Sequence, residues 1–404
     1  MSVTITGLKT PPVLHIFNRR FTLRLAILLL VLLIVCVSKL WKIFTLDINE
    51  EVVMTNEDEE EKFRTTSRNC QPKHNVLFLK THKTGSSTLT NILNRYGDIH
   101  NLTFALPQDG FYNFYWPLPF EKSFIKDTKG NQPNILCHHA RWNKNPMKEL
   151  MALDSVFITI LRNPVTQFES TFSYMGFAHL FGIETGRDSI QAFITDPNGI
   201  MAKFANSSLA ENVFPYLNLL KNGQFFDLGL DSIHFHDDEK VNMAIDEIAR
   251  NFNLVLLMEY FDESLVLLAN EACWDVRDIV YFKLNQRKSG DKEDKFSDEL
   301  VEKIRLWNRA DVLLYDYFNK TFWNQIKKLG SAFKADVERL RYYNEVLRES
   351  CLVPGEYNTK AYTKQARPVR GYALKENLDT PLKTLCEKMI TNELDYLQLL
   401  TGRV

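Results

Sequence analysis

A basic, hydroxyl-rich loop follows a short apolar run near residue 80, in the stretch "VLFLKTHKTGSSTL". The pattern predicts a buried strand over Asn75–Lys80 and a helix over Ser87–Tyr96. A helix N-terminus offers free backbone N–H groups and a positive partial charge. Gly85 permits close backbone approach, and Lys83 adds a mobile positive charge. The loop therefore predicts a phosphate or sulfate site, to which the hydroxyl donors Thr84, Ser86, Ser87 and Thr88 also belong.

This loop differs from the nucleotide-binding loop of ATPases. The pattern G-x-x-x-x-G-K-[ST] is absent, because Lys83 precedes Gly85. The next strong strand, Val156–Leu161, ends in Arg162 rather than in an aspartate that could help to hold magnesium. A kinase or GTPase is thus disfavoured, and we expect no metal. A polar turn capped by serine is the simpler alternative.

A second anion-binding pattern begins at Arg162, at the end of that strand. Ser170 follows eight residues later, on a helix predicted over Pro164–Tyr174. A guanidinium and a hydroxyl could meet on one phosphate, although a surface ion pair between Arg162 and Glu169 would also explain the pattern. Two such sites suggest a nucleotide with phosphates at both ends, as in 3′-phosphoadenosine compounds.

At this point the sequence resembles the sulfotransferases that use 3′-phosphoadenylyl sulfate (PAPS). The resemblance implies that Lys83 to Thr88 hold the 5′-phosphosulfate, with Lys83 at the bridging oxygen, and that Arg162 and Ser170 hold the 3′-phosphate. The blocks "VFITILRNPVTQFESTFSY", "NGQFFDLGLD" and "LVLLMEYFDESLVLL" are similar to the galactose 3-O-sulfotransferase family. "CWDVRDIVYFKLNQR" is most similar to the glycolipid-sulfating branch of that family.

The resemblance implies a reaction and a choice of acceptors. A sulfuryl group would pass from PAPS to the 3-hydroxyl of a terminal β-galactose, on galactosylceramide and related glycolipids. The alternative acceptor is N-acetyllactosamine-type galactose on glycoproteins or oligosaccharides. A heparan-type sulfotransferase and a non-catalytic lectin on the same fold are further alternatives. A heparan-type enzyme would be expected to need a basic groove for its polyanionic acceptor, and the formal net charge of -1 gives no support for one. The same net charge gives no support for nucleic acid as a partner.

A sugar hydroxyl has a high pKa, so a general base should lie beside it. In "NILCHHAR", two histidines end a short apolar run. The family resemblance implies that His139 is the base, and Glu169 is the reserve candidate. His82 is expected to position the loop backbone. The aromatic run "FYNFYW" at 111–116 could stack on galactose, but we favour an ordinary core or lid segment.

Strands and helices alternate along the body of the chain. Further strands are predicted over Asn134–Cys137 and Leu254–Met258, and a helix over Asp262–Ala272 with Asp262 as its cap. Amphipathic helices are predicted over 297–318 and 332–349. This order predicts an α/β protein with a central parallel sheet flanked by helices. The resemblance makes it a P-loop-like sulfotransferase fold.

The N-terminal region predicts one membrane anchor. "LAILLLVLLIVCV" lies within an apolar segment, 21–41, long enough to span a thin bilayer. Basic residues precede it and an acidic run follows it, so the positive-inside rule makes 1–20 a cytoplasmic tail, 42–69 a lumenal stem and 70–404 a lumenal sulfotransferase domain. We therefore expect a single-pass type II protein of the Golgi membrane. A cleaved signal peptide is the alternative.

Two further patterns fit a lumenal body. Sequons predict N-glycosylation at Asn101, Asn206 and Asn319. The five cysteines after the anchor allow at most two intrachain disulfides and leave one over, with the pairing undetermined. The oligomeric state stays open, a homodimer included.

Overall fold

The structure is a computed structural model that describes residues 70–108, 111–186, 188–207, 210–284, 296–360 and 369–402. Contacts divide the chain into two units, Met1–Arg68 and Asn69–Val404, and every described residue belongs to the second. The predicted tail, anchor and stem lie outside the described residues. Across the described ranges, no helix is long and apolar enough to cross a bilayer.

A four-stranded parallel sheet forms the centre of the described unit. Its strand order is β2-β1-β3-β4, where β1 is Val76–Leu79, β2 is Ile135–Leu136, β3 is Val156–Leu161 and β4 is Leu254–Leu257. Every residue of these strands is buried, as expected for a sheet covered on both faces. The predicted parallel α/β sheet is confirmed. The strands β1, β2 and β4 are shorter than predicted, because their predicted end residues lie outside the sheet, and Met258 instead begins a short 3-10 helix (Met258–Tyr260).

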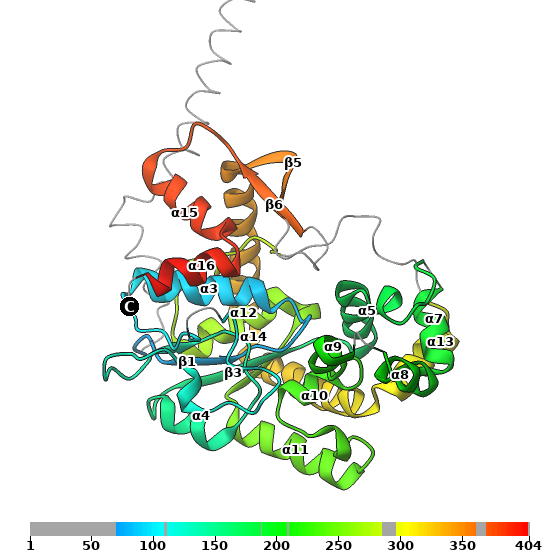
Figure 1. Ribbon diagram of the computed structural model, residues 1–404. Helices are drawn as coiled ribbons and strands as arrows, with labels where there is room; N and C mark the ends of the chain where they lie inside the picture. Colours follow the sequence, from blue (N-terminus) through cyan, green and yellow to red (C-terminus); the bar gives the residue numbers. More distant parts are fainter. Residues whose placement is uncertain are drawn as a thin grey trace, which may run out of the picture. The chain divides into compact units, whose positions relative to one another are not determined.

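The chain changes direction across the sheet at β1. Helix α3 (Ser86–Ile99) leads from β1 to β2, and α4 (Lys144–Leu150) leads from β2 back past β1 to β3. Because such crossovers are right-handed, this reversal places α3 and α4 on opposite faces, as Figure 1 shows. The carboxyl edge of β1 and β3 is therefore a topological switch point, where α/β sheets bind ligands.

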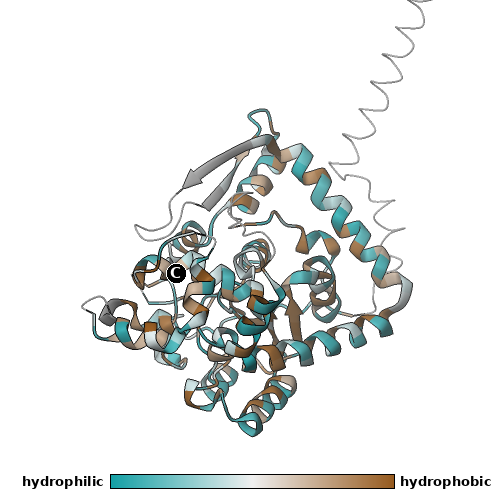
Figure 2. Cartoon of the chain, turned by 90° about the vertical axis from the view of Figure 1, so that its right-hand side faces the viewer, coloured by the Kyte–Doolittle hydropathy of each residue, from teal (hydrophilic) through white to brown (hydrophobic). Residues whose placement is uncertain are grey.

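A second hydrophobic cluster lies beside the sheet and is built around α5 (Pro164–Met175). Aromatic side chains of Phe168, Phe172, Phe177 and Phe193 pack together in it. Figure 2 shows that the helices carry hydrophobic and hydrophilic residues on different sides. The other helices of this cluster are α6 (Phe177–Leu180), α7 (Ser189–Thr195), α8 (Pro197–Ala205), α9 (Ala210–Leu217) and α13 (Asp298–Trp307). Helices α10 (Gly223–Asp227) and α11 (Asp238–Asn251) bury their apolar residues in the main core instead.

The C-terminal half departs from two predictions. The helix predicted over 297–318 is divided at Asn308, which ends α13. The Asn308 side chain accepts a hydrogen bond from the backbone N–H of Asn222 (2.9 Å), a residue distant in the sequence. Helix α12 (Phe261–Ala272) has Tyr260 at its N-cap, so Asp262 lies in the first turn and is not the cap. Helix α14 (Arg309–Cys351) includes the second predicted helix and has a kink at Gly330.

The chain ends in a hairpin and two helices. Strands β5 (Leu352–Lys360) and β6 (Val369–Leu374) pair antiparallel. Helices α15 (Thr380–Ile390) and α16 (Glu393–Thr401) follow, and both contact α3. Figure 1 shows α16 alongside α3.

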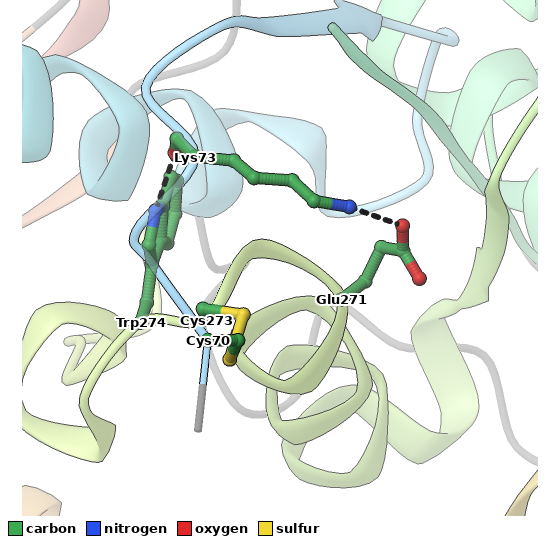
Figure 3. Close-up of a disulfide and its surroundings, with 5 residues drawn as sticks. All are labelled: Cys70, Lys73, Glu271, Cys273 and Trp274. Carbon is green, nitrogen blue, oxygen red and sulfur yellow. Dashed lines mark hydrogen bonds and ion pairs between the residues drawn. A yellow bond between two sulfur atoms is a disulfide. The ribbon is translucent and has the colours of Figure 1, made fainter. Parts of the chain in front are cut away.

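Two disulfides join distant parts of this unit. Cys70 pairs with Cys273 and Cys351 pairs with Cys386, which leaves Cys137 as a buried free thiol. Figure 3 shows the first bridge beside Lys73, whose ammonium contacts Glu271 (2.9 Å) and whose carbonyl accepts from the Trp274 indole (2.8 Å). The segment before β1 is thus fastened to the end of α12.

Candidate functional site

The predicted anion loop runs from the end of β1 to the start of α3. Gly85 is the N-cap of α3 and has a left-handed backbone with φ of 76°. No side chain caps this helix and its first turn holds no acidic residue, so its N-terminal N–H groups suit an anion. A Cβ added at Gly85 would lie 3.2 Å from the Met258 side chain, so glycine fits both the conformation and the space.

Several hydroxyls of the loop make internal hydrogen bonds. Thr84 and Ser86 both donate to the carbonyl of Thr81, at 3.2 and 2.8 Å. Thr88 accepts a hydrogen bond from the Leu284 backbone N–H at 3.0 Å. These bonds hold the loop in a fixed shape, a role that the sequence did not distinguish from direct anion binding.

The structure brings the two predicted anion-binding stretches together. The Arg162 guanidinium donates to the carbonyl of Lys83 (3.1 Å) and to the Thr166 hydroxyl (2.9 Å). β1 and β3 are neighbours in the sheet, which places both residues at the same edge. Ser170 and the reserve base Glu169 lie buried on α5, about two turns beyond its start. A direct contact joins Arg162 to the loop, whereas Ser170 makes no hydrogen bond to the described loop residues.

His82 is held by a buried carboxylate that the sequence analysis missed. Asp227, at the end of α10, is fully buried and accepts the His82 backbone N–H at 2.7 Å. It also accepts the His82 Nδ1–H at 3.0 Å and the Trp116 indole N–H at 2.9 Å. This arrangement leaves His82 Nε2 as the proton acceptor of the ring. The sequence predicts that His82 positions the loop backbone. The structure adds that its ring contacts Asp227 and Trp116.

His139 lies directly against His82. The two rings stack with centroids 3.9 Å apart and planes inclined by 14°. The Nδ1–H of His139 donates to the Lys80 carbonyl (3.1 Å), so its Nε2 is also the acceptor. Burial, and then the nearby charges of His82 and Lys80, lower the pKa of His139 well below 6.5. His139 is therefore neutral at pH 7, the form in which it can accept a proton.

An aromatic wall adjoins the loop. The Lys83 ammonium lies 3.5 Å from the centre of the Tyr174 ring, and Trp116 contacts both His82 and Tyr216. The hydroxyls of Tyr112 and Tyr216 are 3.1 Å apart. The predicted aromatic run is divided, since Phe114 and Trp116 are buried while Phe111 and Tyr112 are exposed. Phe225 and Phe226 belong to the core.

The predicted glycosylation sites differ in exposure. Asn101 lies exposed after α3, and Asn206 lies exposed at the end of α8. Asn319 lies within the first third of α14 and is half-buried. Among the described residues, no group of three or more His, Cys, Asp or Glu side chains is placed to hold a metal ion.

The fold and site define an α/β protein with a switch-point loop that suits an anion, beside an arginine and a pair of histidines. The sequence model described as Galactose-3-O-sulfotransferase matches residues 11–404, so the chain belongs to the galactose-3-O-sulfotransferase family. The galactosylceramide sulfotransferase of Bos taurus is 38% identical over 81% of this chain and 78% of its own length. Galactose-3-O-sulfotransferase 2 of Homo sapiens is 35% identical, over 81% and 82% of the two chains.

Proposed function

We propose that this chain transfers a sulfuryl group from PAPS to the 3-hydroxyl of the terminal β-galactose of galactosylceramide. Family membership makes it a galactose 3-O-sulfotransferase. The observation that carries the assignment of the site is the bond from Arg162 to the Lys83 carbonyl, which joins the two anion-binding stretches at the switch point of the sheet. The finer fold assignment, a P-loop-like sulfotransferase fold, rests on the same strand-loop-helix.

The residues present fit an anionic nucleotide donor. The uncapped N-terminus of α3 supplies backbone N–H groups, and Lys83 and Arg162 supply positive charge beside it. We assign the 5′-phosphosulfate to Lys83, Thr84, Gly85, Ser86, Ser87 and Thr88, and the 3′-phosphate to Arg162 and Ser170. When bound, the donor supplies a sulfuryl group on a good leaving group. Lys83 neutralises negative charge that develops on the leaving oxygen, as preorganised cations do in phosphoryl transfer.

The paired histidines take up the proton of the acceptor hydroxyl. His139 and His82 both present Nε2 as the acceptor, because each Nδ1–H is already donated. His139 remains our first candidate for the base. Burial, and then the charges of His82 and Lys80, lower the pKa of His139, so its ring is held in the neutral form that accepts a proton. The stacked rings therefore act as one proton-accepting unit with two acceptor nitrogens.

The glycolipid acceptor is favoured over free glycans by the relatives. The galactosylceramide sulfotransferases of Bos taurus and Homo sapiens are 38% and 37% identical, compared with 35% for galactose-3-O-sulfotransferase 2 of Homo sapiens. This difference is small, so N-acetyllactosamine-type acceptors are the second candidate.

The topology is proposed from the sequence with support from the disulfides. Two disulfides fit an oxidising compartment, in agreement with a lumenal body. The family match begins at residue 11 and so includes the predicted anchor. We propose a cytoplasmic tail at 1–20, an anchor at 21–41, a stem at 42–69 and a catalytic domain at 70–404, in the Golgi membrane.

The test is transfer of radiolabelled sulfate from PAPS by the full-length chain in detergent. We expect transfer to galactosylceramide that exceeds transfer to lactose and N-acetyllactosamine, and loss of transfer in K83A. Transfer only to the free glycans would replace the glycolipid proposal by the second candidate. Transfer to none of the three, by protein that is folded by circular dichroism, would overturn the proposed function.

A further inference from the structure

Lys80 lies beneath the anion loop, and its ammonium contacts three polar side chains. The side chain is only 1% exposed. Its Nζ lies 3.3 Å from the Ser86 hydroxyl, 3.4 Å from the Ser87 hydroxyl and 3.1 Å from a Glu393 carboxylate oxygen. An ammonium has three N–H donors, and these three contacts use them all. Lys80 is therefore a buried structural cation and not a solvated surface charge.

Glu393 reaches this position from the other end of the chain. It is the first residue of α16, and its carboxylate also accepts the Ser87 hydroxyl at 3.3 Å. Its second oxygen lies 3.6 Å from Nδ1 of the buried His138. Burial alone would raise the pKa of Glu393, but the charge of Lys80 and the contact with His138 hold it well below its usual range. The group is thus an anion at neutral pH.

The C-terminal helices are fastened to α3 next to the loop. The Asn91 side chain on α3 donates to the carbonyls of Lys388 and Thr391, at 2.9 and 3.0 Å. Lys388 forms an ion pair with Asp98 at 2.6 Å. The Cys351–Cys386 disulfide ties α15 to the end of α14. These contacts fix where α16 begins and so where the Glu393 carboxylate lies.

We infer that Glu393 is a positioning residue for donor binding, because it holds Lys80 and Ser87 in place beneath the anion loop. A buried ammonium without a counter-ion is destabilised and tends to lose its proton. Glu393 is the counter-ion of the buried Lys80 ammonium, which contacts both serine hydroxyls at the start of α3. Their two charges cancel, which leaves Lys83 and Arg162 as the cations for the donor.

The inference rests on the proposed function, since it assigns the loop to the nucleotide donor. Its test is therefore direct binding of adenosine 3′,5′-bisphosphate, measured by calorimetry on the full-length chain in detergent. The variant is E393Q, which keeps the shape of the side chain and removes its charge. The control is E387Q, at an exposed glutamate on α15.

We expect E393Q to weaken nucleotide binding about tenfold, which is the size of one lost or misaligned charge-assisted hydrogen bond. E387Q should bind as the wild type does. In the sulfotransfer assay, E393Q should raise the donor KM while leaving the acceptor KM unchanged. A general loss of structure would not separate these two constants.

A second variant covers the case in which E393Q fails to fold. The double variant K80Q/E393Q removes both charges, so no unpaired ammonium is left buried, and the same loss of nucleotide binding is expected. Unchanged binding in either variant would overturn the inference. Tighter nucleotide binding in E393Q would also overturn the inference, because the Glu393 carboxylate would then compete with the donor for the anion site. If the wild-type chain itself does not bind the nucleotide, the proposed function fails rather than the role of Glu393.

Discussion

The imidazole rings of His82 and His139 stack with their centroids 3.9 Å apart, although 57 positions separate the two residues in the chain (139 minus 82). The pairing arises because the loop after β1 and the segment after β2 leave neighbouring parallel strands at the same edge. Each ring donates its Nδ1–H to an oxygen, one to Asp227 and the other to the Lys80 carbonyl. Two acceptor nitrogens therefore belong to one small site.

Removing either ring should slow catalysis. We expect H139Q and H82Q each to lower kcat by about 10²–10⁴, the usual contribution of a general base. H179Q, at an exposed histidine on α6, is the control and should keep normal turnover. The measurement is steady-state sulfotransfer to galactosylceramide. If H139Q kept near-normal turnover while E169Q lost it, Glu169 would be the base.

The lowered pKa of His139 also predicts a dependence of stability on pH. As pH falls through 6.5, the unfolded chain binds a proton at this histidine and the folded chain does not. The free energy of unfolding should therefore decrease below pH 6.5 through this group. In H139Q, this part of the slope should be missing. Denaturant unfolding of both proteins at pH 7.5, 6.5 and 5.5 gives the comparison, and parallel slopes would contradict the prediction.

The Asp227 carboxylate fixes both the ring of His82 and its backbone. D227N keeps the size of the side chain but leaves only one oxygen to accept hydrogen bonds now made by His82 and Trp116. We expect kcat to fall by about 10²-fold or more, since a misoriented imidazole presents the wrong nitrogen. D246N, at an exposed aspartate on α11, is the matched control. Normal kcat in D227N would show that His82 is not part of the proton-accepting unit.

Local sequence patterns were enough to predict the strands and the anion loop. The features that they did not predict depend on contacts between residues far apart in the sequence. A short apolar run such as Val156–Leu161 indicates a buried strand without knowledge of its neighbours, and the structure has it over the same residues. Asp227 lies 145 positions from His82, so no local pattern could pair them. The approach of Glu393 to Lys80 has the same origin. The break at Asn308 likewise depends on a bond to the distant Asn222.

The Cys351–Cys386 disulfide should affect nucleotide binding through the position of α16. Cys386 lies on α15, seven residues before Glu393 (393 minus 386), so the bridge restrains the helix pair that brings this carboxylate to the loop. We expect C351S/C386S to weaken binding of adenosine 3′,5′-bisphosphate in the same direction as E393Q. The measurement is calorimetry on the full-length chain, together with a titration of free thiols.

The other disulfide provides the control for this prediction. Cys70–Cys273 fastens the segment before β1 to the end of α12, as Figure 3 shows, and none of the residues drawn there belongs to the anion loop. Removing a native disulfide costs about 2–5 kcal/mol of stability, so C70S/C273S should lower the melting temperature. Its nucleotide affinity at 25 °C should remain that of the wild type as long as it is folded. Equal losses of affinity in both double variants would mean that general destabilisation, rather than the placement of Glu393, links the C-terminal bridge to the donor site.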